Sequence, residues 1–161
     1  MNGLKFFLLF LVPVYAVAGQ PDRIHDIQNQ VSDSLLIYAD REEECLDKKK
    51  ELPAKELRNV GLTDSKLKDA LEYFYFKNLV ECSKDQADQL VVNLQMLLLV
   101  APEKAQETLA TSKLVLDDRI KLLELKKKYL KISRIQRDLI ESVHGVDQPI
   151  DLIATAKSLG I

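Results

Sequence analysis

The sequence predicts an all-α bundle of four to six helices, held by one disulfide and preceded by a cleaved signal peptide. Apolar residues recur every three or four positions along most of the chain, which is the spacing of one helix face. Period-two alternation, typical of strands, is absent beyond a few residues. Five glycines and five prolines leave long stretches without a helix breaker. These features favour helices that pack through short connections.

The N-terminal residues 1–19 have the composition of a secretory signal peptide. Lys5 precedes a short apolar run, and small residues that suit cleavage follow it, with the cut after Ala18 or Gly19. The run is shorter than the ~20 apolar residues that a membrane-spanning helix needs. We therefore expect a secreted, extracellular protein with no stable membrane span, in which residues 20–161 form a single helical domain.

The first helix is expected over residues 22–52, where no Pro or Gly occurs. Its apolar stripe consists of Ile24, Ile27, Val31, Leu35, Tyr38, Cys45 and Leu52. Pro53 and Gly61 predict a connection, and Thr63 is placed to cap a second helix over residues 63–82. The stripe of this second helix consists of Leu67, Ala70, Leu71, Phe74, Asn78 and Cys82.

The chain's two cysteines, Cys45 and Cys82, lie on these two inward stripes. An even pair in an oxidising compartment predicts one disulfide, here between two packed helices. Cys45 lies near the end of its helix, whereas Cys82 lies far from the start of its own. We therefore expect the connection over residues 53–61 to run along the bundle axis and absorb the offset.

Three further helices are expected over residues 84–100, 102–143 and 148–159. A capping box at Ser83 favours a break there, and the apolar run over residues 96–100 should be deeply buried because it is apolar all round. Pro102 suits a first helical turn, and no Pro or Gly follows until Gly145, although Thr111 and Ser112 offer a breakpoint. Gly160 ends the last helix.

The composition and the motifs exclude several functions. A net charge of −2 disfavours nucleic acid, and the lysine runs 48–50 and 126–128, flanked by acids, are expected to be solvated helix faces. His25 and His144 lie at opposite ends of the chain without the spacing of a metal site. Adjacent carboxylates do not converge on a helix, and no glycine-rich phosphate loop occurs. We therefore expect no enzyme, metal or cofactor.

The remaining function is binding. The expected function is that of a secreted helical interaction protein, an extracellular ligand or effector that binds a protein partner. The alternative is an extracellular carrier of an apolar small molecule or lipid held between helices. Four consecutive aromatics nearly encircle the second helix. Phe74 shares the core stripe, so Tyr73, Tyr75 and Phe76 are the candidate partner or ligand surface.

Overall fold

The structure is a computed structural model that describes residues 21–161, with side chains described except at 21, 107–112 and 114–116. The signal peptide expected at residues 1–19 lies outside this part of the chain. The described part of the chain is mostly helical, has no β-strand beyond one isolated bridge and contains one disulfide, as predicted. Its helices are α1 (Pro21–Asp47), α2 (Ala54–Asn59), α3 (Asp64–Cys82), α4 (Lys84–Val100), α5 (Pro102–Tyr129), α6 (Arg134–Glu141) and α7 (Leu152–Leu159).

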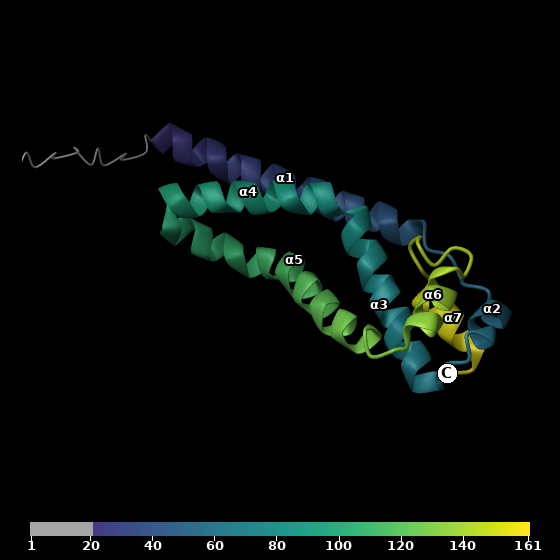
Figure 1. The fold of residues 1–161 in the computed structure, drawn as a ribbon. Helices are drawn as coiled ribbons and strands as arrows, with labels where there is room; N and C mark the ends of the chain where they lie inside the picture. The colour runs from purple at the N-terminus through teal and green to yellow at the C-terminus, as the bar shows by residue number, and fades with distance from the viewer. Residues whose placement is uncertain (1–20) are drawn as a thin grey trace, which may run out of the picture.

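Helices α1 and α4 form an elongated antiparallel pair, and α5 returns from the far end of this pair to α3 (Figure 1). Helix α4 lies antiparallel along α1, and α3 leaves the α1–α4 pair at a steep angle (Figure 1). Helix α5 turns back at Ala101, packs first on α4 and then crosses to α3 (Figure 1). The short helices α2, α6 and α7 gather at the far end of α3. None of the described helices is long and apolar enough to cross a membrane.

Two hydrophobic clusters stabilise the two ends of this arrangement. The cluster between α1, α4 and the start of α5 consists of Ile27, Val31, Tyr38, Ala87, Leu90, Leu94, Leu97, Ala101 and Ala105. The cluster around α3 consists of Leu52, Leu57, Val60, Leu67, Ala70, Leu71, Phe74, Tyr129, Ile132, Ile140, Val143, Val146, Ile150 and Leu159. The inward stripes predicted for the first two helices supply many of these residues, because helical periodicity selects one buried face.

The break predicted at Ser83 is confirmed, but its cause differs from the prediction. Ser83 has φ −103° and ψ 12°, and its side chain makes no cap bond with α4. Its hydroxyl instead donates to the carbonyl oxygen of Leu79 at 3.1 Å, within the last turn of α3. A serine that bonds back to the preceding turn bends a helix, and α4 therefore departs from the α3 axis.

The first helix is shorter than predicted. It ends at Asp47 because the chain from Lys50 pairs with the segment before α7. The amide of Lys50 donates to the carbonyl of Pro149 at 2.9 Å, and its carbonyl accepts from the amide of Asp151 at 2.8 Å. Lys50 therefore satisfies its backbone in an isolated parallel bridge, and the amide of Leu52 donates to the hydroxyl of Thr155 at 3.0 Å, so the chain here leaves the helix.

The connection expected between the first two long helices contains a helix of its own, α2. Thr63 caps α3 as predicted, accepting from the amide of Lys66 at 3.4 Å. Figure 1 shows the chain descending from the end of α1 to the start of α3, along the length of α3, as the offset between the cysteines requires. The bundle therefore has seven helices in residues 21–161, more than the four to six predicted.

The expected helix over residues 102–143 is two helices in the structure. Helix α5 runs unbroken through Thr111 and Ser112 but ends at Tyr129. Ser133 then caps α6, its hydroxyl oxygen accepting from the amide of Gln136 at 3.3 Å. The intervening Ile132 is buried in the core, which turns the chain inward. Helix α6 ends at Glu141 with Ser142 as its C-cap, so Gly145, at φ +83°, lies beyond the helix and does not close it as predicted.

The last helix begins at Leu152 and not at residue 148. Asp151 caps it, its carboxylate accepting from the amide of Ala154 at 2.9 Å. Gly160 ends the helix at φ +69°, as predicted. The loop before α7 is held by buried Asn78 of α3, whose amide nitrogen donates to the carbonyls of Val146 at 2.8 Å and Gln148 at 2.6 Å.

Candidate functional site

The disulfide marks the junction of α1 and α3. Cys45 and Cys82 are bonded as predicted, with their Cα atoms 6.2 Å apart. Cys45 is fully buried, and Cys82 is the last residue of α3. The bond therefore fixes α1 at the point where α3 gives way to α4. It orients the two hydrophobic clusters, which share no buried residue, relative to each other.

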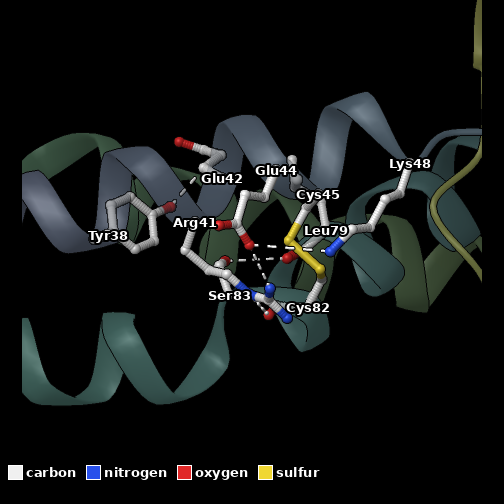
Figure 2. The surroundings of a disulfide bond; sticks show 9 residues. All are labelled: Tyr38, Arg41, Glu42, Glu44, Cys45, Lys48, Leu79, Cys82 and Ser83. Atoms are coloured by element: carbon white, nitrogen blue, oxygen red, sulfur yellow. Dashed lines mark hydrogen bonds and ion pairs between the residues drawn. A yellow bond between two sulfur atoms is a disulfide. The ribbon is translucent and has the colours of Figure 1, made fainter.

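Arg41 of α1 bonds to residues of both helices at this junction. Its Nε donates to the carbonyl oxygen of Cys82 at 3.1 Å, and one terminal nitrogen bonds the Glu44 carboxylate at 2.7 Å (Figure 2). Lys48 approaches the same carboxylate at 3.9 Å. A cation at the carboxyl end of a helix satisfies an unpaired carbonyl and suits the helix dipole. The charges of Arg41 and Glu44 are paired with each other, so this arrangement stabilises the junction around the disulfide.

The first two residues of the aromatic run, Tyr73 and Phe74, pack against α5. The ring of Tyr73 stacks on that of Tyr129, with centroids 4.5 Å apart, and Phe74 meets Tyr129 edge-on at 5.3 Å. The Tyr129 hydroxyl donates to Glu141 of α6 at 2.7 Å. Burial raises the pKa of Tyr129, as does the negative charge of Glu141. This part of the run therefore joins three helices, and Phe74 is core as predicted.

Tyr75 and Phe76 form a second pair, with their rings edge-on at 5.3 Å. Tyr73, Tyr75 and Phe76 are all half-buried, so none of the three presents a fully open ring. Their role in binding stays a prediction. The most open apolar side chains of the described chain lie elsewhere.

A half-buried acidic niche lies between α1 and α5. Glu42 accepts from the hydroxyl of Tyr38 at 3.4 Å (Figure 2). Burial raises the pKa of Glu42, and the charge of Asp118 on α5 raises it further. The pKa of Asp118 is raised by burial and by its neighbour Asp117. Burial, with the charges of Glu42 and Asp118, also raises the pKa of Tyr38 to about 12.

This niche was not predicted, because its two carboxylates are far apart in the sequence. It does not by itself make a catalytic or metal site. Among the residues whose side chains are described, no three His, Cys, Asp or Glu come together in a way that could hold a metal ion. At neutral pH the Glu42 carboxylate in this niche is charged and half-buried, which lowers the free energy of unfolding.

The apolar run over residues 96–100 is not deeply buried, contrary to the prediction. Only Leu97 is fully buried, whereas Met96 is 41% and Leu99 84% exposed. Val92, one turn earlier, is 48% exposed. Helix α4 packs against α1 and α5, and in the described part of the chain the face of α4 that points away from both is open. We call Val92, Met96 and Leu99 the α4 stripe.

A hollow of about 680 Å³ opens near the start of α2. Its lining consists of Lys50, Glu51, Leu52, Pro53, Ala54, Glu56, His144, Gly145 and Gln148. Carrier sites are enclosed and mostly apolar. This hollow is open to solvent and has charged groups on its walls, so it does not suit an apolar ligand.

Comparison of the chain with protein-family models, curated proteins and solved structures finds no match. The candidate site is therefore argued from the residues alone. Of the predicted site residues, the structure brings Cys45 and Cys82 together and distributes the three aromatics among packing positions. The exposed α4 stripe was missed. Its signal in the sequence is that Leu97 falls on the stripe of Leu90 and Leu94, whereas Leu99 does not.

Proposed function

We propose that this chain is a secreted helical interaction protein that binds a protein partner through the α4 stripe. The observation that carries the proposal is the set of three large apolar side chains, Val92, Met96 and Leu99, exposed on one helix face. Apolar side chains that are exposed together, and not singly, mark interaction sites.

The spacing of the stripe suits recognition of a helix. Val92, Met96 and Leu99 stand at i, i+4 and i+7, the anchor positions of a helix that lays its apolar face into a partner's groove. Polar residues border the stripe, with Gln89 and Gln95 both exposed. An apolar centre with a polar rim is the usual anatomy of a protein interface. Met96 adds adaptability, because its unbranched side chain fits irregular surfaces.

The scaffold supports a rigid presentation of this face. On the opposite side of α4, Leu90, Leu94 and Leu97 are buried against α1. Buried Asn93 donates to the carbonyl of Gln30 on α1 at 3.2 Å and accepts from Gln89 at 3.1 Å. A helix that is already fixed by packing against the rest of the protein loses little conformational freedom on binding. The apolar N-terminal run in the sequence and the disulfide are compatible with secretion, which is part of the proposal.

The proposal is tested by measuring the binding of labelled protein to cells from the tissue that expresses the chain. A binding curve that saturates, and that excess unlabelled protein displaces, supports a protein receptor. Linear, non-displaceable uptake contradicts it. Native mass spectrometry of protein purified from its own fluid gives a second readout. A bound lipid or apolar metabolite at unit stoichiometry would support the carrier function in its place.

A further inference from the structure

A strongly basic segment covers the carboxyl end of α5 and the start of α6. Between Arg119 and Arg137 there are eight Lys and Arg residues and one Glu, a formal net charge of +7. The chain as a whole carries −2, so the remaining residues carry −9 (−2 minus +7). The charge of this protein is therefore unevenly distributed along the sequence, and cations concentrate in this segment.

Several of these cations have no partner inside the protein. Arg119 pairs with Asp88 at 2.7 Å, and Lys128 pairs with Asp69 at 3.2 Å. In the part of the chain with described side chains, Lys126, Lys127 and Lys131 form no ion pair, and all three are exposed. Arg134 is exposed and only approaches Asp138, at 3.9 Å. A long surface cation at that distance contributes little to stability.

Large apolar side chains are exposed among these cations. They are Ile120, Leu123, Leu130 and Ile135, with Leu123 61% and Ile135 75% exposed. The dipole of α5 accounts for lysines in its last turn. It does not account for four open aliphatic side chains beside them, whose hydration is unfavourable. We call the six residues Ile120, Leu123, Lys126, Lys127, Leu130 and Lys131, which follow one another at helical spacings along the end of α5 and the turn after it, the basic–apolar face.

We propose that the basic–apolar face docks the protein on a membrane surface that contains anionic lipid. The aliphatic side chains enter the boundary between headgroups and acyl chains, while the cations bind headgroup phosphates and carboxylates. An interfacial helix combines these two features, with its apolar face buried ~5–10 Å into the boundary. The inference goes beyond the proposed protein-binding function and concerns a separate face, at the end of α5 away from the α4–α5 turn (Figure 1).

The position of Lys127 favours lipid over an apolar protein groove. It lies between Leu123 and Leu130 at helical spacings of four and three residues, so its charge stands in the middle of the apolar face. A dry protein groove would bury this charge, which is unfavourable. At a membrane interface the lysine stem can lie along apolar surface while the amine reaches the headgroups.

Vesicle co-sedimentation tests the proposal, with phosphatidylcholine vesicles compared with vesicles of phosphatidylcholine and phosphatidylserine. We expect binding to the anionic vesicles only, weakened by salt. The variant K126Q/K127Q/K131Q should bind roughly a hundredfold more weakly, since each lysine near an anionic surface is worth about 1 kcal/mol. The control K49Q/K55Q/K68Q removes the same charge from exposed positions elsewhere and should bind within severalfold of wild type.

The apolar contribution has its own variant and control. L123S/L130S should lose binding to anionic vesicles, whereas L36S/I153S, two equally exposed aliphatic positions on other helices, should retain it. Circular dichroism checks that all variants fold. Equal binding to both kinds of vesicle overturns the proposal, and so does an equal loss in the two lysine variants. Full binding by L123S/L130S, or binding to heparin beads without binding to vesicles, would mean recognition of a polyanion and overturns it too.

The two proposals fail separately. The variant V92S/M96S/L99S should bind anionic vesicles like wild type, because the α4 stripe is not part of the basic–apolar face. Loss of vesicle binding in this variant would contradict the assignment of the lipid site to the end of α5.

Discussion

Glu42 illustrates how a single side chain sets a pH dependence. Its pKa is raised in the folded state, first by burial and then by Asp118. The folded protein therefore binds this proton more tightly than the unfolded chain does. The free energy of unfolding consequently falls as pH rises from the ordinary carboxyl range through the raised pKa of the folded state. Above that window the full unfavourable contribution of the buried charge is present.

The substitution Glu42→Gln removes this charge and keeps an acceptor for the Tyr38 hydroxyl. We expect the variant to unfold at a higher temperature than wild type at pH 7. Below about pH 4 the difference should vanish, because Glu42 is then protonated in both states. Thermal unfolding followed by circular dichroism at both pH values measures this. Glu43→Gln, at an exposed neighbouring position, is the control and should change little.

A variant Glu42→Gln that is less stable than wild type at pH 7 would contradict the conclusion that the charge of Glu42 destabilises the folded state.

The sequence could not have predicted the niche, because the proximity of Glu42 to Asp118 depends on how α5 packs relative to α1. Their adjacent acids, Glu43 and Asp117, look identical to them in the sequence and are exposed. Only the tertiary arrangement distinguishes the buried member of each pair.

At the scale of the helix, periodicity predicted most of the core but not the break after Tyr129. The signal for that break was present as a capping box, Ser133 to Gln136, of the kind that was recognised at Ser83. At Ser83 the box predicted the right break for the wrong reason. Local signals therefore identify possible helix starts, and packing decides which of them are used.

The apolar run in α4 shows what local composition cannot decide. Five consecutive apolar residues, 96–100, cover every side of a helix, and full burial would require neighbours on every side. Among the described helices, α1 and α5 are the main neighbours of α4. The number of neighbours is a property of the whole fold, so the exposed positions could not be separated from the buried one by composition alone.

Matched substitutions in this run test the assignment. Leu97→Ala should lower the free energy of unfolding by about 2–5 kcal/mol, because it opens a cavity in the core. Leu99→Ala should change it by no more than about 0.5 kcal/mol, as expected for an exposed position. Urea denaturation measures both. Equal losses at the two positions would mean that the run is buried all round and that the α4 stripe does not exist.

At the scale of the molecule, the disulfide connects two clusters that share no buried residue. The pairing of Cys45 with Cys82 was predictable, because each cysteine falls on an inward stripe. The bond closes a loop with a sequence separation of 37. The chain-entropy model assigns such a loop about 4 kcal/mol.

The double variant C45A/C82A should therefore be less stable than wild type by about 4 kcal/mol in urea denaturation. Reduction of wild type should give a loss of the same order, while reductant should leave the double variant unchanged. Unaltered wild-type stability under conditions that fully reduce the bond would contradict this role of the disulfide.

The whole-molecule account rests on the α4 stripe as the surface for a protein partner. The most direct measurement compares the cell-binding affinity of V92S/M96S/L99S with that of I153S, which changes an equally open aliphatic position on α7. We predict that the triple variant loses saturable binding while remaining folded, and that I153S binds like wild type. Saturable binding of undiminished affinity by the triple variant would contradict the account.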